Sequence, residues 1–238
     1  MDESFAGQVS GVAALADPTR RELFRYVVAQ GDAVSRDQAA AGVEVPRHTA
    51  KFHLDRLVEE GLLDTEFKRL TGRRGPGAGR PTKLYRRSAR ELSVTVPQRH
   101  YDLAGHLLAT AIEASPADRM TAVEALRRAA AETGRILGNQ ARQDAGPRAG
   151  RTKATDAVCA TLTAHGYAPR RQDDTVTLAN CPFDALARDH RDLICGMNLA
   201  LLDAMVDRGT DARVTAQLDP ADGRCCVKLV ASRTDSDL

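Results

Sequence analysis

The sequence predicts an α+β fold in three consecutive parts, and three observations support this prediction. Apolar residues recur at spacings of three and four through residues 8–60 and again through 97–145, as in amphipathic helices. Residues 62–67 and 82–87 have strand-like patterns on either side of a Gly- and Pro-rich stretch. Residues 152–230 mix both kinds of pattern. We therefore expect structural parts at 1–95, 96–146 and 147–238.

Composition indicates a folded chain outside the membrane. The 238 residues are 42% hydrophobic, which is enough for the cores of two domains. No apolar run approaches the ~20 residues that a membrane-spanning helix needs. The chain begins Met-Asp-Glu-Ser, without the cationic start and apolar stretch of a signal peptide. We expect a soluble cytoplasmic protein with no membrane partner.

The first part contains four predicted helices with local start and stop signals. Asp17 and Ser35 carry oxygen atoms suited to N-capping. Pro18 and Pro46 suit the first turn of a helix, and Gly61 suits its end. The expected helices are 8–16, 18–29, 36–41 and 46–60.

The fourth predicted helix is short, amphipathic and basic. One face is apolar, and the opposite face carries cationic and hydrogen-bonding side chains near its N-terminal end. A tight turn joins it to the third helix, so the pair forms a helix-turn-helix. Such a helix fits the major groove of double-stranded DNA, although a solvated helix would show the same pattern. The side chains expected to meet base edges or flanking phosphates are Arg47, His48, Thr49 and Lys51.

The segment that follows makes the DNA prediction stronger. Residues 68–90 contain nine Lys and Arg and no acidic residue, while the whole chain has a net charge of only +2. Glycines and prolines in 71–81 indicate a hairpin tip, which would present Arg73, Arg74 and Arg80 as a wing toward the DNA backbone or minor groove. The alternative is a solvated charged loop, but uncompensated cations on one hairpin repel each other unless an anion is near.

Three motifs resemble the winged-helix domain of ArsR-type bacterial transcriptional regulators. They are Leu15-Ala-Asp-Pro-Thr-Arg-Arg-Glu-Leu, Thr49-Ala-Lys-Phe-His-Leu-Asp-Arg-Leu-Val-Glu-Glu-Gly-Leu-Leu, and Gly79-Arg-Pro-Thr-Lys-Leu-Tyr. The resemblance covers about residues 8–95. Metal-sensing members of this family often carry paired cysteines before the recognition helix, and residues 36–41 contain none. Any sensing is therefore expected elsewhere in the chain.

The second part, 96–146, is predicted to form two amphipathic helices separated at Ser115-Pro116, with Ser115 as a cap. Two helices without a complete core of their own commonly pair with a second copy. We interpret them as a homodimer interface, as expected for a palindromic operator with two-fold symmetry. The alternative is that they pack only on their own chain. The third part, 147–238, is expected to be a small α+β module that acts as a sensor.

All five cysteines lie at or beyond position 159. An odd number in a cytoplasmic chain argues against a structural disulfide framework. Cys159 lies on an apolar helix stripe and is interpreted as a buried hydrophobic residue. The others lie at predicted element boundaries, where thiolates can converge to bind an iron–sulfur cluster or zinc. They are Cys181, Cys195, Cys225 and Cys226.

The layout is similar to SufR-type iron–sulfur regulators, which join an ArsR-like winged helix to a C-terminal Cys-Pro motif and two later cysteines. Cys181-Pro-Phe, Leu193-Ile-Cys and Gly223-Arg-Cys-Cys carry the resemblance. It implies cluster ligands at Cys181, Cys195 and one of Cys225 or Cys226. The residues after Pro182 and Cys195 differ from the usual SufR residues, which leaves zinc open as the metal. A fourth ligand could be the other thiol, His190, His165, a carboxylate or a small molecule.

These observations predict a transcriptional regulator whose affinity for DNA is controlled by a cysteine-ligated iron–sulfur cluster. Alternatives are a zinc-binding regulator and a thiol/disulfide switch without a cluster. An enzyme using Cys195 with His190 is disfavoured, because residues five positions apart do not face each other on a helix. We expect no enzymatic activity.

Overall fold

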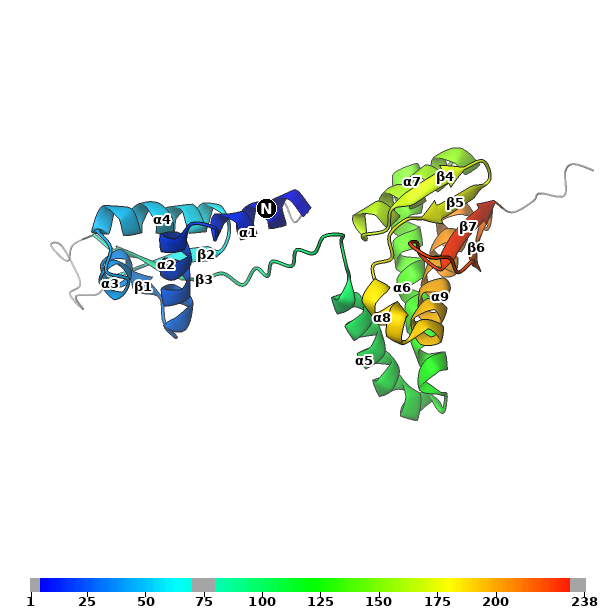
Figure 1. The fold of residues 1–238 in the computed structure, drawn as a ribbon, viewed down its shortest axis with the longest axis horizontal. Coiled ribbons are helices and arrows are strands. Elements are labelled where there is room, and N and C mark those ends of the chain that lie inside the picture. The colour runs from blue at the N-terminus through cyan, green and yellow to red at the C-terminus, as the bar shows by residue number, and fades with distance from the viewer. Residues whose placement is uncertain (1–4, 70–79, 232–238) are drawn as a thin grey trace, which may run out of the picture. The chain divides into compact units, whose positions relative to one another are not determined.

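The computed structural model describes residues 5–69 and 80–231, and it divides the chain into two compact units, 1–94 and 95–238 (Figure 1). Each unit has its own hydrophobic core. Over the described residues, none of the helices combines the length and the apolar character needed to span a bilayer.

The first unit is a helical domain with one small antiparallel sheet. Its elements are α1 (Phe5–Ala14), α2 (Pro18–Ala29), β1 (Val34–Ser35), α3 (Arg36–Gly42), α4 (Arg47–Glu59), β2 (Leu63–Lys68) and β3 (Thr82–Arg87). The strand order is β1-β3-β2. The structure confirms the predicted pair α3–α4 and the predicted hairpin β2–β3.

Local hydrogen bonds set the bounds of these helices. The Asp17 carboxylate accepts from the Arg20 amide at 2.7 Å, and Ser35 forms a capping box with Gln38. Pro46 is the N-cap of α4, one residue before the helix begins. Gly61 has a φ of 72°, a conformation that favours glycine and lets the chain leave α4 for β2.

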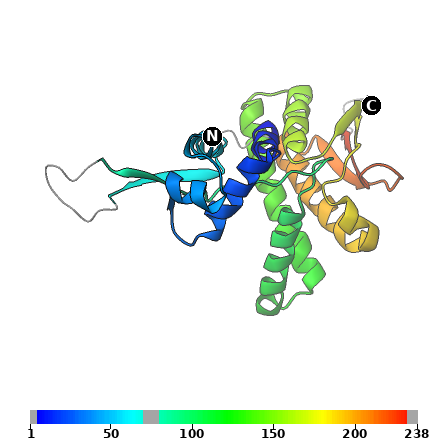
Figure 2. The same cartoon turned by 60° about the vertical axis from the view of Figure 1, so that its left-hand side comes forward.

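The second unit packs helices against a four-stranded antiparallel sheet of order β4-β5-β7-β6 (Figure 2). Its helices are α5 (Tyr101–Asp118), α6 (Ala122–Ala145), α7 (Arg151–Ala164), α8 (Asp184–Asp189) and α9 (Arg191–Thr210). Its strands are β4 (Pro169–Gln172), β5 (Thr175–Leu178), β6 (Val214–Leu218) and β7 (Val227–Ala231). One core joins the helices α5, α6, α7 and α9 to the sheet. The two central helices therefore share a compact unit with the elements expected to form the sensor.

The break between α5 and α6 lies later than predicted. Helix α5 continues through Ser115 to Asp118, and Ser115 donates a hydrogen bond to the Met120 carbonyl instead of capping a helix. The start of α6 is set by Thr121, which forms a capping box with Glu124. The expectation that Ser115 is the cap is thus wrong, because Thr121 and Glu124 cap α6 and satisfy each other's backbone amides at its N-terminus.

Helix α6 packs closely on α9 through glycines. A Cβ atom at Gly134 would lie 2.1 Å from the carbonyl oxygen of Leu201, and one at Gly138 would lie 2.4 Å from that of Met205. The face of α6 that carries Leu126 and Ala130 is buried within its own chain.

Gly134→Ala is therefore expected to destabilise the second unit by about 1–3 kcal/mol or more, because backbone must move to admit the methyl group. Gly105→Ala is the matched control, since a Cβ at this exposed position of α5 has no neighbour within 4 Å. The control is expected to be neutral or to stabilise by up to about 1 kcal/mol. Denaturant titrations followed by circular dichroism measure both changes. Equal effects of the two variants would contradict the packing of α6 on α9.

Candidate functional site

Helix α4 presents polar side chains on the face opposite its buried residues Ala50, Leu54 and Leu57. The side chains of Arg47, His48 and Lys51 are exposed, and Thr49 is half-buried. Two of the cations already have acidic neighbours. The Nε atom of Arg47 lies 3.4 Å from Asp37, and the Nζ atom of Lys51 lies 3.1 Å from Asp55. Both pairs are exposed enough for a phosphate to compete with the carboxylate.

Asp55 connects α4 to the hairpin. Its carboxylate accepts hydrogen bonds from Lys83 Nζ at 2.7 Å and from the Tyr85 hydroxyl at 2.9 Å. Burial alone would raise the pKa of Asp55, but hydrogen bonds from Lys83, Lys51 and Tyr85 outweigh burial and lower it. This contact fixes the base of the wing relative to α4. Arg80 is exposed just before β3, while Arg73 and Arg74 lie outside the described residues.

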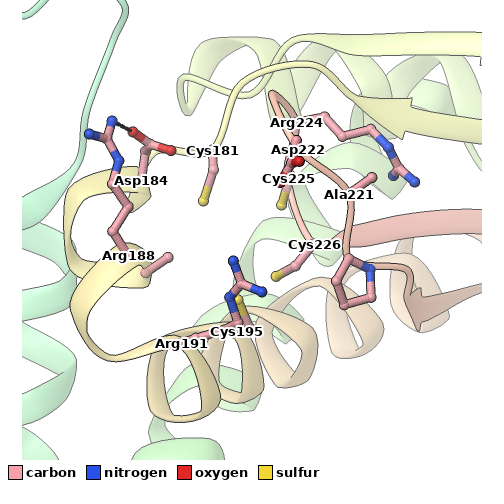
Figure 3. A pocket seen from close by; sticks show the side chains of 12 residues that line it. Cys181, Asp184, Arg188, Arg191, Cys195, Ala221, Asp222, Arg224, Cys225 and Cys226 are labelled. Carbon is pink, nitrogen blue, oxygen red and sulfur yellow. Dashed lines mark hydrogen bonds and ion pairs between the residues drawn. The ribbon is translucent and has the colours of Figure 1, made fainter.

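Four cysteines of the second unit line one cavity of about 160 Å³ (Figure 3). Cys181 follows β5, Cys195 lies in the first turns of α9, and Cys225 and Cys226 precede β7. Their sulfur atoms point toward the same space. Cys159, on α7, is half-buried and is not part of this lining. Sequence reasoning thus selected the residues that the fold brings together.

Cys225 and Cys226 both face the cavity, although adjacent side chains on a strand would point apart. The reason is that β7 begins only at Val227, so the pair lies in the segment that precedes the strand. The amide of Cys225 donates to the Leu178 carbonyl at 2.9 Å, which holds this segment beside the end of β5. Both sulfur atoms can therefore lie at the cavity although the two cysteines are adjacent in sequence.

The thiols share hydrogen bonds, which divide them into donors and acceptors. A hydrogen bond with Cys225 lowers the pKa of Cys181, and bonds with Cys225 and Cys195 lower that of Cys226 to about 6. Burial raises the pKa of Cys195 to about 12, and the bonds to Cys181 and Cys226 raise that of Cys225. The arrangement stabilises the thiolate, the form that binds metals, at Cys181 and Cys226, and the neutral thiol at Cys195 and Cys225.

Two buried polar residues, Tyr167 and Asn198, form a hydrogen-bonded chain that ends at the Cys225 sulfur. The side-chain amide of Asn198 donates to the Cys225 sulfur at 3.2 Å, and its oxygen accepts from the Tyr167 hydroxyl at 2.5 Å. Asn198 and Cys225 are each only 1% exposed. An amide donor directed at a sulfur stabilises negative charge there, as groups behind metal ligands commonly do.

Charged side chains surround the thiols. Arg188, Arg191 and Arg224 line the cavity together with Asp184 and Asp222. Arg191 favours the charged forms of Cys195 and Cys226. Among the described residues the buried Nη1 atom of Arg224 has no hydrogen-bond partner, while Nη2 donates to Asp219 at 2.6 Å. Arg188 pairs with Asp184 and Arg224 with Asp219, so it is Arg191 that favours negative charge at the thiols.

The four thiols do not have the arrangement of a complete metal-binding site. In the part of the chain that the structure describes, no three His, Cys, Asp or Glu side chains are arranged to hold a metal ion. The histidines considered as a fourth ligand lie elsewhere: His190 is exposed and outside the lining, and His165 hydrogen-bonds the Thr161 carbonyl. Ligation of a single ion would therefore require the thiol side chains, or the segments that carry them, to shift.

Sequence reasoning missed three residues at this site, namely Tyr167, Asn198 and Arg99. Asn198 had a weak signal, because it is a polar residue inside an otherwise apolar stretch of a helix. Arg99 donates to the Cys181 carbonyl at 2.8 Å across a long separation in sequence. No local pattern indicates that contact.

One comparison with known proteins gives a match. Residues 15–66 match a family model described as a helix-turn-helix domain, which spans α2 to the first half of the hairpin. The comparisons with curated proteins and with solved structures give no match. The family match supports a DNA-binding regulator with an ArsR-like winged helix-turn-helix, and it does not reach the thiol cavity.

Proposed function

We propose that this chain is a transcriptional regulator that binds a palindromic DNA operator as a homodimer and is controlled by a cysteine-ligated iron–sulfur cluster. The DNA-binding part follows from the helix-turn-helix match and from the exposed cations of α4. The observation that carries the control by a cluster is the convergence of four thiols from three segments on one cavity.

The residues around the cavity fit an anionic cluster. Cys181, Cys195, Cys225 and Cys226 would hold it, and the bound cluster would supply reversible one-electron chemistry and sensitivity to oxidants. Asn198 would donate to the Cys225 sulfur, as it does now. Arg191 would offset negative charge at the rim, because it already favours the thiolates of its neighbours. Zinc at the same thiols is the alternative metal.

A thiol/disulfide switch is a second candidate, and the thiol-to-thiol hydrogen bonds favour it. Cys181 contacts Cys225, and Cys195 contacts Cys226. Joining either pair would form one S–S bond, release two protons and pass two electrons to an oxidant such as a peroxide. Mass spectrometry of the peroxide-treated protein would show this as a loss of two hydrogen masses per disulfide.

The proposed homodimer uses side chains that α5 and α6 leave exposed. Ile112 is 66% exposed and Ile136 is 62% exposed, and Val123 is also on the surface. These apolar residues lie on the two helices whose opposite faces fill the core of their own unit. Sedimentation of the full chain measures the assembly state.

The test is anaerobic purification of the full chain, followed by visible absorbance and analysis of iron, sulfide and zinc. A duplex selected by the protein from a random-sequence pool then serves as the DNA probe. We expect iron and sulfide together, and an affinity that changes about 5–150-fold when a chelator removes the metal. Affinity should also fall as salt rises. Protein without iron or zinc, or equal affinities with and without metal, would refute the proposed control.

A further inference from the structure

The first residues of the second unit hold the loop that carries Cys181. The Arg99 guanidinium donates through Nη1 to the Cys181 carbonyl at 2.8 Å and to the Asn180 side-chain oxygen. Its Nη2 atom lies 3.6 Å from Asp184, at the start of α8. The Arg99 side chain is only 16% exposed, so these contacts are shielded from solvent. One arginine therefore holds the Cys181 loop at three successive points.

Backbone groups beside Arg99 strengthen this attachment. The His100 amide donates to the Pro182 carbonyl at 3.1 Å, and the Asn180 amide group donates to the Gln98 carbonyl at 3.0 Å. The Arg99 amide is itself fixed by the Thr95 hydroxyl at 2.7 Å. Segment 95–100 and loop 180–184 are thus bonded from both sides, and movement of the loop must break these bonds or carry segment 95–100 with it.

The segment that leads to Arg99 is attached to the first unit, which carries α4, a few residues earlier in the sequence. Arg90 donates to the Glu60 carbonyl at 2.9 Å, just after the end of α4. Leu92 packs on the core of the first unit, in contact with Gly11 of α1. Only residues 93–98 separate these contacts from Arg99. A displacement at Arg99 can therefore reach the unit that carries α4 along the chain through this short segment, in which each residue has two soft backbone torsions.

A change at the thiols that moves the Cys181 loop disturbs this attachment. The four thiols are not arranged to hold a metal ion as they stand among the described residues, so ligation of an ion requires their side chains or the segments that carry them to move, and the Cys181 loop is one of these segments. A ligand shifts a conformational equilibrium only through contacts that differ between the two states. The carbonyl and side-chain contacts of the Cys181 loop with Arg99 are contacts of that kind.

We propose that Arg99 is a positioning residue that transmits the state of the thiol cavity through residues 93–98 to the DNA-binding unit. This inference rests on the proposed function, because it names the route by which that same site regulates DNA affinity. The covalent chain between the two units is sufficient for this route.

The test compares the DNA affinity of metal-loaded and chelator-treated full-length protein, using the duplex selected by the wild type. Arg99→Gln removes the fork of donors, and Arg99→Lys keeps the charge but not the fork. Arg171→Gln is the matched control, an arginine of the same unit that pairs with Asp156 at 3.0 Å away from the cavity. A fourth variant inserts Gly-Ser between Val94 and Thr95, which leaves every contact of Arg99 in place.

We expect the wild type and Arg171→Gln to show the same ratio between loaded and treated affinities. In Arg99→Gln and in the insertion variant the ratio should fall to within about twofold of one, while iron content and visible absorbance stay near wild type. The ratio for Arg99→Lys should lie between the ratio of the wild type and that of Arg99→Gln.

An unchanged ratio in the insertion variant would overturn the inference, even if Arg99→Gln fails to bind iron or to fold. An unchanged ratio in Arg99→Gln would overturn it as well. Failure of the proposed function gives a different result, because the wild type itself would then show no difference between loaded and treated protein.

Discussion

Cys181→Ser is expected to lower the iron content of anaerobically purified protein at least about tenfold and to abolish the visible absorbance. Cys181 is 8% exposed and directs its sulfur into the cavity shared with the other three thiols (Figure 3). Serine keeps the size of the side chain but replaces a soft thiolate with a hydroxyl that stays protonated. We expect iron content and visible absorbance to fall also in Cys195→Ser, Cys225→Ser and Cys226→Ser.

Cys159→Ser is the matched control for this series. Cys159 is half-buried on α7 and does not line the cavity, so its replacement should leave iron content and absorbance unchanged. The DNA affinity of Cys181→Ser should no longer respond to a chelator. Full iron content in all four cavity variants would show that the metal, if present, binds elsewhere.

Arg47→Ala is expected to weaken binding to the selected duplex by about 5–150-fold, which corresponds to about 1–3 kcal/mol. The Arg47 side chain is 73% exposed at the N-terminal end of α4, where the residues of a recognition helix reach base edges or phosphates. Its neighbour Asp37, at 3.4 Å, is too exposed to hold it against a phosphate.

Two further measurements identify the kind of contact that Arg47 makes. If it binds phosphate, Arg47→Ala should weaken all sequences alike and reduce the salt slope by about one. If it binds a base, a repeated selection should lose preference at one position of each half-site. Arg25→Ala is the control, since Arg25 is exposed on α2, outside the α3–α4 pair, and its loss changes net charge equally. Equal weakening by both variants would exclude a specific role for Arg47.

The sequence by itself determined the helix-turn-helix and the hairpin beside it. Ser35 and Gly61 mark helix ends through bonds and torsions within a few residues, so their effect is readable from local sequence. The density of cations in 68–90 is likewise a property of the chain alone. The positions of the cysteines at element boundaries were sufficient to nominate a site.

Only the tertiary structure decided what those residues do together. The break before Thr121 and the burial of α6 against α9 depend on a capping pair and on glycine contacts with Leu201 and Met205, which periodicity does not encode. The convergence of the thiols, and the contacts of Asn198 with Cys225 and of Arg99 with Cys181, join segments far apart in the chain. Contacts of this kind are set by how whole elements pack, and a local pattern carries no record of its distant partner.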